Sequence, residues 1–130
     1  LNEAGVRCGV LVAPVLPGLS DRPEQLEAVV KACVDAGAAT ITPILLHLRP
    51  GVREHYLAWL AGARPELSAR YDELYPRAYA PKATQQALSR QVARLVARHG
   101  GRVAPPRETR DVPTRRPARR TKADQLALEV

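Results

Sequence analysis

Two apolar runs that bracket one amphipathic segment constrain the fold of this chain more than any other feature. The first run, CGVLVAPVL, extends from Cys8 to Leu16, and the second, TITPILL, extends from Thr40 to Leu46. Runs without polar alternation are typical of strands buried on both faces of a parallel sheet. The segment between them has apolar residues at the spacing of one helical face, namely Leu26, Val29, Val30 and Cys33. The sequence therefore predicts adjacent parallel strands joined by a helix near Arg22 to Ala36.

Turn and capping signals indicate where these elements end. The pair Pro17-Gly18 follows the first run and predicts a sharp turn. Asp21 precedes the helical pattern, so we expect its carboxylate to cap that helix, with Glu24 as the capping-box partner. Pro43 lies inside the second run. Because proline cannot donate to a β ladder, we expect this strand to be short or bulged there.

Three more helical patterns follow the second apolar run. Their apolar faces comprise Val52, Tyr56, Trp59 and Leu60, then Leu67, Tyr71 and Leu74, then Leu88, Val92, Leu95 and Val96. We expect Tyr56 and Trp59 to lie in the core. The order is strand, helix, strand and then helices, and two strands alone do not make a stable sheet. We therefore expect the chain to be a fragment of a larger α/β protein, which the absence of methionine also indicates.

Charge is distributed unevenly and divides the chain into two regions. Residues 1–101 carry 12 basic and 9 acidic side chains, whereas residues 102–130 carry 8 basic and 4 acidic ones. The second region is rich in proline and poor in large apolar residues, so we predict a disordered basic tail. Its arginine cluster at 115–120 could neutralise nucleic-acid phosphates. The tail lacks aromatic residues for base stacking, which favours the alternative of a solvated tail without a partner.

Cysteine usage and the remaining motifs exclude several classes of site. Cys8 and Cys33 are the only cysteines, and their spacing matches neither CxxC nor CxxxCxxC. We expect reduced, buried thiols in a cytoplasmic protein, with an oxidised pair as the alternative in an oxidising compartment. No apolar run approaches the ~20 residues that span a bilayer. The chain also has no P-loop and no GxGxxG motif.

Three motifs carry a resemblance to a known family. They are VAPVLPGLSD at 12–21, LLHLRPGVREHYLAWL at 45–60 and YAPKA at 79–83. In this order and spacing they resemble the radical S-adenosylmethionine (radical SAM) proteins similar to spore photoproduct lyase, often labelled DNA repair photolyases. The resemblance covers roughly residues 1–100. Residues 1–101 would then be the C-terminal part of a partial TIM-type (β/α)6 barrel, and the two apolar runs its fifth and sixth strands.

The resemblance also implies a cofactor chemistry that this chain supplies only in part. In the family, a CxxxCxxC loop in the N-terminal half of the barrel binds a [4Fe-4S] cluster, which reductively cleaves S-adenosylmethionine. That motif is absent here. We therefore expect no catalytic residue and no metal ligand in this chain, and expect it to be inactive without the missing N-terminal half of the barrel.

The same resemblance assigns a small set of candidate cofactor contacts. The end of the fifth strand and its loop supply apolar contact to the adenine, which implies Val15, Leu16 and Pro17 here. The end of the sixth strand adds backbone hydrogen bonds to the base edge, which implies Leu45, Leu46 and His47. Core packing is favoured for Val15 and Leu45, which leaves Leu16, Pro17, Leu46 and His47 as the candidate contacts. The alternative for these residues is barrel packing, or a surface role for His47. A phosphate contact by Arg49 and Arg53 and a solvated surface are both open.

A rival hypothesis does not depend on the family. The chain could be a non-catalytic, small basic α/β module that binds nucleic acid or a protein partner.

Overall fold

The computed structural model describes residues 1–102 of the 130-residue chain. The elements are η1 (Asn2–Ala4), β1 (Gly9–Val15), α1 (Pro23–Asp35), β2 (Thr40–Leu45), α2 (Val52–Ala63), η2 (Pro65–Leu67), α3 (Ser68–Leu74) and α4 (Lys82–Arg98). The mixed α/β class is therefore confirmed. The predicted disordered tail, apart from Arg102, lies outside the described residues.

The predicted parallel pair is confirmed. Strand β1 pairs with β2 in parallel, from Gly9 opposite Thr40 to Val15 opposite Leu45, and α1 is the connection between them. The pairing shifts in register after Val12, which lies opposite Pro43. From there β1 advances three residues while β2 advances two, so β1 carries the extra residue of a bulge. The predicted bulge of the second strand at Pro43 is therefore wrong, because the extra residue lies on β1, between Val12 and Val15. Strand β2 itself spans six residues.

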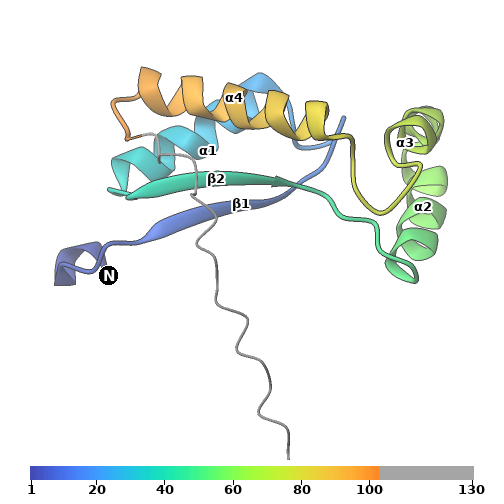
Figure 1. Cartoon of the computed structure of the whole chain (residues 1–130), viewed down its shortest axis with the longest axis horizontal. Coiled ribbons are helices and arrows are strands. Elements are labelled where there is room, and N and C mark those ends of the chain that lie inside the picture. The colour runs from blue at the N-terminus through green and yellow to red at the C-terminus, as the bar shows by residue number, and fades with distance from the viewer. Residues whose placement is uncertain (103–130) are drawn as a thin grey trace, which may run out of the picture.

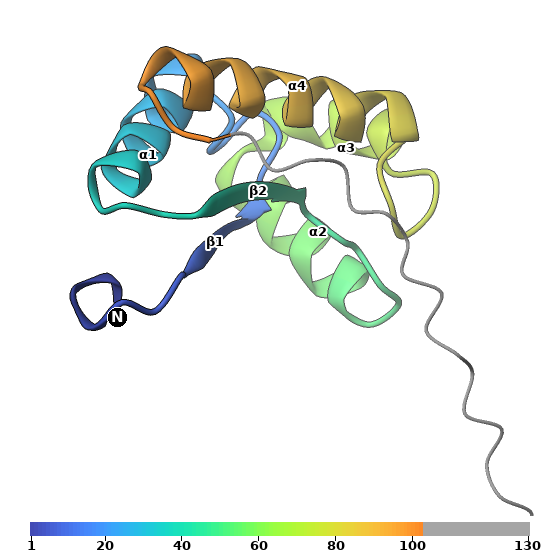
Figure 2. The same ribbon diagram turned by 60° about the vertical axis from the view of Figure 1, so that its left-hand side comes forward.

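The helices are arranged asymmetrically around the sheet (Figures 1 and 2). Helices α1 and α4 lie together over one face, whereas α2 and α3 lie beyond the carboxyl ends of the strands. The opposite face of the sheet is covered by no element of the described residues. Leu11 points to that face and is 63% exposed, although it lies mid-strand. Strand side chains alternate between faces, so the apolar strands are buried on one side only.

The core lies between the sheet and its helices. Its fully buried side chains include Val15 and Leu48 from the sheet region, Val30 from α1, Leu60 from α2 and Val92 from α4. Helix α4 buries all four residues of its predicted face, because its apolar stripe keeps strict helical spacing against β2 and α1. No helix within residues 1–102 has the length and apolar character required to cross a membrane.

One prediction of core packing is wrong. Trp59 is 51% exposed instead of buried, and Val52, on the same predicted face, is also exposed. Helix α2 contacts the core through Leu60, with Tyr56 and Leu57 packed partly against it. The contacting face is therefore rotated toward Leu57, which leaves the indole at its margin.

The predicted helix cap is also wrong. Helix α1 begins after Arg22, which makes no side-chain capping hydrogen bond. Asp21 instead accepts a hydrogen bond from the Gly18 N–H at 2.8 Å. Its carboxylate therefore closes the turn before the helix, a local side-chain to backbone bond that competes with helix capping.

Candidate functional site at the carboxyl ends of the strands

Three chain segments meet where the two strands end. The Leu46 N–H donates to the Val15 carbonyl at 3.0 Å, which joins the exit of β2 to the end of β1. The Leu48 N–H donates to the Ala78 carbonyl at 2.8 Å, which joins the same exit to the loop between α3 and α4. The carboxyl end of a parallel sheet is where α/β proteins usually bind ligands, because its loops vary while the strands hold their positions.

The turn after β1 is held by its own hydrogen bonds. The Leu16 carbonyl accepts from the N–H groups of Leu19 at 3.0 Å and Ser20 at 2.9 Å. The Leu16 N–H donates to the Ser20 hydroxyl at 2.8 Å. Leu16 is half-buried, whereas Pro17 is buried. Leu16 therefore has apolar surface available at the rim, while the Pro17 ring has none to offer a ligand in this conformation.

Helix α3 and the segment before it pack against this turn. Gly18 has a φ of 75°, and a Cβ atom there would lie 3.0 Å from the Leu67 side chain. The left-handed φ and the close approach together require glycine. The Tyr71 hydroxyl donates to the Pro17 carbonyl at 2.8 Å and accepts from the Tyr56 hydroxyl at 3.0 Å. The turn at the candidate site is thus joined to both α2 and α3 by hydrogen bonds through two tyrosine hydroxyls.

Burial perturbs the two core tyrosines of this region. Tyr71 and Tyr75 are both fully buried and stack with their ring centroids 5.6 Å apart. Burial, followed by the hydrogen bond with Tyr56, raises the pKa of Tyr71 far above its ordinary value. Burial likewise raises the pKa of Tyr75 to about 12. Among residues 1–102, the Tyr75 hydroxyl has no hydrogen-bond partner. Both phenols therefore stay neutral, and they do not supply a base.

Of the two predicted residues at the end of β2, Leu46 lies at the core and His47 lies at the surface. Leu46 is half-buried and packs against the core. His47 is exposed, and its ring meets the Tyr79 ring edge-on, with centroids 4.5 Å apart and planes at 63°. The structure thus brings Leu16, Pro17, Leu46 and His47 to one end of the sheet, with Leu16 and His47 the more accessible. Sequence reasoning did not assign Tyr79 a role, although it lies in one of the motifs.

Arg53 has a structural role that sequence reasoning did not identify. Its Nη1 donates to the Tyr75 carbonyl at 2.5 Å, at the end of α3. The guanidinium therefore satisfies a carbonyl that the helix leaves without an intrahelical partner. Arg49, by contrast, is exposed. A phosphate contact at Arg53 would have to compete with this bond.

An open hollow of about 470 Å³ lies at the other end of the sheet. Its lining includes Arg7 and Arg102 together with glycine-rich turns at Gly37 and Gly100. Helices α1 and α4 both end here, and helix C-termini carry partial negative charge. That charge opposes anion binding by the two arginines, so the hollow favours no ligand class. We therefore place the candidate site at the strand carboxyl ends.

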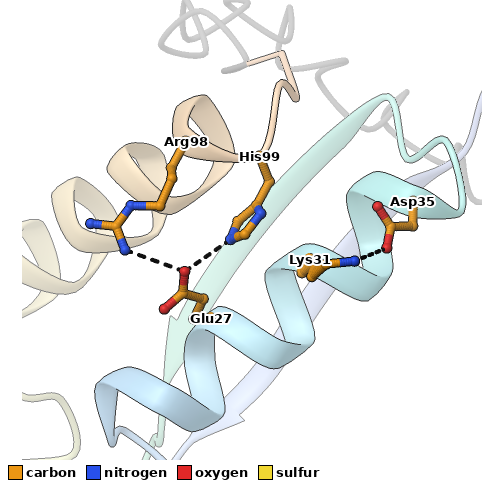
Figure 3. Close-up of polar contacts among 5 residues, drawn as sticks. All are labelled: Glu27, Lys31, Asp35, Arg98 and His99. Carbon is orange, nitrogen blue, oxygen red and sulfur yellow. Dashed lines mark hydrogen bonds and ion pairs between the residues drawn. The ribbon is translucent and has the colours of Figure 1, made fainter.

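Outside the candidate site, polar contacts of Glu27 connect α1 with the C-terminal end of α4 (Figure 3). Its Oε1 lies 3.0 Å from His99 Nε2 and 3.2 Å from Arg98 Nη1. The hydrogen bonds of His99 and then Arg98 lower the pKa of this carboxyl below its ordinary value. On the same helix, Lys31 and Asp35 form an exposed pair at 2.6 Å. The two clusters differ in that only the first joins separate helices.

This geometry predicts that the contact between α1 and α4 through Glu27 weakens in acid. The pKa of Glu27 is lower in the folded state than in the unfolded state, where it is about 4.3. The ionised carboxylate therefore stabilises the fold above the unfolded pKa, and this contribution is lost as the pH falls through the folded-state pKa. Glu27→Gln should therefore lower the melting temperature at pH 7, and its difference from the parent should shrink as the pH falls below the unfolded pKa of about 4.3. Thermal melts followed by circular dichroism, at pH 7 and at a series of lower pH values, measure both effects.

Asp35→Asn is the matched control, since it removes an i,i+4 surface pair worth only about 0.3–0.5 kcal/mol. Equal decreases in melting temperature in the two variants at pH 7 would show that the contact between helices stabilises the fold no more than a surface ion pair does.

Comparisons with known proteins identify relatives without a stated function. The chain is 43% identical over 100 residues to the uncharacterized proteins Rv2578c of Mycobacterium tuberculosis and Mb2609c of Mycobacterium bovis. The match covers 76% of this chain and spans 29% of the length of each relative. No family model matches the chain, and no solved structure matches it. The relatives are therefore longer proteins that contain a counterpart of this α/β unit.

Proposed function

We infer that this chain is the C-terminal part of the barrel of a radical SAM enzyme similar to spore photoproduct lyase. The observation that carries the proposal is the meeting of two parallel strand ends, joined by the hydrogen bond from Leu46 to Val15. That meeting brings together Leu16 and His47, which the family resemblance assigns to the adenine of S-adenosylmethionine. The barrel itself and its activity are part of the proposal.

The uncovered sheet face supports an incomplete barrel. Leu11 is 63% exposed at the middle of β1, and an apolar strand residue normally packs against a second layer. In a (β/α)6 barrel this face would line the interior, while α1 and α4 would form part of the outer helical ring. The relatives have the additional length for further βα units, since the matched region is 29% of each.

The residues present do not fit the iron–sulfur cluster that the family implies. Such a cluster requires three cysteine thiolates close together on one loop. This sequence has two, and Cys8 and Cys33 are free and half-buried, the first before β1 and the second on α1. Within residues 1–102, no group of three His, Cys, Asp or Glu side chains could hold a metal ion. The cluster ligands would therefore lie outside this chain.

The contribution of this chain is accordingly to bind and orient the adenosine end of the cofactor. Leu16 would offer apolar surface to the base, and its turn is fixed by bonds to Leu19 and Ser20. Leu46 would fill the site wall from the core side, and His47 would meet the base at the exposed rim. Pro17 would act through its carbonyl, which anchors the turn to Tyr71.

The proposed substrate class is nucleic acid. The family resemblance points to DNA repair photolyase-like chemistry, and the net charge of +7 favours a polyanionic partner. The arginine cluster at 115–120 is the proposed contact with phosphates, through charge alone, since the tail has no aromatic residue for base stacking. Its binding should then be sequence-independent and should weaken steeply with added salt.

Leu16→Asp tests the cofactor proposal in the longer protein that carries this chain, reconstituted with iron and sulfide. Apolar packing of the base on Leu16 is worth about 1–2 kcal/mol, so affinity for S-adenosylmethionine should fall roughly tenfold while iron content stays unchanged. Calorimetric titration measures the affinity. Val52→Asp, an equally polar change at an exposed residue of α2, should leave both unchanged.

Unaltered affinity in Leu16→Asp would remove this residue from the site. Failure of the longer protein to bind S-adenosylmethionine or to assemble a cluster would reject the proposed function and favour the non-catalytic module.

A further inference from the structure

Helix α4 carries positive charge that nothing on the helix itself balances. Its basic residues are Lys82, Arg90, Arg94 and Arg98, and it contains no acidic residue. Helix α1, which packs beside it, has charges of both signs and pairs Lys31 with Asp35. Like charges four residues apart on a helix repel each other and destabilise it. The arginine row at 90, 94 and 98 therefore opposes the stability of α4.

This arginine row lies on the face of α4 that points away from the core. The helix is buried through Leu88, Val92, Leu95 and Val96. Because successive residues are about 100° apart around the axis, Arg90 and Arg94 project from the opposite side, and both are exposed. In Figures 1 and 2 no other described element lies beyond α4 on the side away from the sheet.

Small side chains leave the row open to a large ligand. The other residues of the outer face include Ala83, Ala87 and Ala97, all exposed. Their methyl groups extend little beyond the helix backbone, so an extended polyanion can approach closely. Four residues of α-helix rise about 6 Å, which is close to the separation of neighbouring phosphates along one nucleic-acid strand.

Two arginines of the row have no anionic partner in the described part of the chain. Within residues 1–102, neither Arg90 nor Arg94 forms an ion pair. Arg98 lies 3.2 Å from Glu27, but its side chain is still 66% exposed. Arg90 and Arg94 are therefore the residues of the row that an external anion can bind without breaking an existing contact.

We propose that the arginine row binds the sugar–phosphate backbone of a nucleic-acid duplex. The planar guanidinium group suits phosphate, because it donates two parallel hydrogen bonds to the oxygens of one group. Helix α4 has no aromatic residue on which unpaired bases could stack, which favours a duplex over a single strand. A membrane surface fits less well, since its outer face has alanines where an interfacial helix has large apolar side chains.

The inference goes beyond the proposed function. It shares the nucleic-acid partner with that proposal, but it follows from the charges of α4 and concerns a surface separate from the strand-end site. It therefore holds whether or not the longer protein cleaves S-adenosylmethionine.

The test is a fluorescence anisotropy titration of the 130-residue chain with a short labelled DNA duplex, over a series of salt concentrations. Arg90→Gln combined with Arg94→Gln should weaken binding roughly tenfold at low salt. The slope of log affinity against log salt should become shallower by about 2, because each lost phosphate contact removes about 0.9. Thermal melts should show this double variant to be at least as stable as the parent, since the repulsion along the row is relieved.

Arg49→Gln combined with Arg77→Gln is the matched control. It removes the same charge from two exposed residues in loops beyond the ends of the strands. The salt slope should then stay that of the parent. Equal changes of slope in the two double variants would overturn the proposal, because net charge alone would explain the binding. Polyglutamate that binds as tightly as the duplex, with the same dependence on Arg90 and Arg94, would also overturn it and favour an acidic protein as the partner.

The outcomes separate this inference from the proposed function. Duplex binding that is insensitive to the α4 variant, in a longer protein that binds S-adenosylmethionine, would reject the α4 surface alone. Duplex binding that depends on Arg90 and Arg94, in a protein whose longer form assembles no cluster, would support the α4 surface and reject the radical SAM assignment.

Discussion

The Leu60→Ala variant should have a free energy of unfolding about 2–5 kcal/mol below that of the parent chain. Leu60 is fully buried in the second half of α2, within the core cluster that includes residues of the sheet and the helices. Truncation removes the transfer free energy of the lost carbons and leaves a cavity that its neighbours fill only partly. Domains of this size are stable by about 5–15 kcal/mol, so the loss is a large part of the total.

Urea unfolding followed by circular dichroism measures this loss, and an unchanged slope with denaturant would show that the same surface is exposed. Val52→Ala, at an exposed position of the same helix, should change the free energy by less than about 0.5 kcal/mol. A loss below about 1 kcal/mol for Leu60→Ala would contradict the packing of α2 in the core cluster. The support proposed for the strand-end site would then be absent.

The elements that local patterns specify were predictable from the sequence. The two apolar runs and the helical pattern between them predict a parallel pair. The helix must return the chain to the end of the sheet where the first strand began. Helix α4 followed its predicted face because all of its buried residues meet one partner layer, formed by α1 and β2. The position of the bulge was not predicted, because its extra residue lies on β1 between Val12 and Val15 and not at Pro43.

What depends on contacts between distant segments was not predictable in the same way. The spacing of α2 permits Leu57 or Trp59 on the buried side. Packing against the core selects Leu57 and leaves Trp59 51% exposed. The site residues Leu16 and His47 came from family resemblance, which assigned no role to Tyr79 although its third motif begins there. Tyr79 reaches His47 only because Leu48 pairs with Ala78, thirty residues further along the chain. No local period encodes that pairing.

The second prediction concerns the buried tyrosines. The variants Tyr71→Phe and Tyr75→Phe make the same chemical change but should have different effects on the free energy of unfolding. Tyr71 and Tyr75 are both fully buried and stacked on each other. The Tyr71 hydroxyl bonds the Pro17 carbonyl and accepts from Tyr56, whereas the Tyr75 hydroxyl has no partner within residues 1–102. Phenylalanine removes the hydroxyl and preserves the ring, so packing stays nearly constant in both variants.

Tyr71→Phe should therefore lower the free energy of unfolding by about 1–3 kcal/mol, because it leaves a buried carbonyl at Pro17 without its donor. Tyr75→Phe should be neutral or stabilising, since burying an unpaired hydroxyl is itself unfavourable. Urea unfolding of both variants measures the difference. Equal destabilisation would show that the ring environment, and not the hydroxyl bond, dominates at both positions.

The same pair of variants tests whether Tyr71 positions the turn of the candidate site. The amides of Leu19 and Ser20 donate to the Leu16 carbonyl, and the turn they close is anchored through Pro17 to Tyr71. In Tyr71→Phe the exchange of these two amides with solvent should accelerate relative to amides in the middle of α4, because the turn opens locally before the chain unfolds. In Tyr75→Phe their exchange should match the parent. Acceleration of all amides alike in Tyr71→Phe would mean that the hydroxyl stabilises the whole fold without holding this turn. Selective acceleration would instead make Tyr71 the residue through which α3 sets the position of Leu16, and with it the apolar wall that the proposed cofactor site requires.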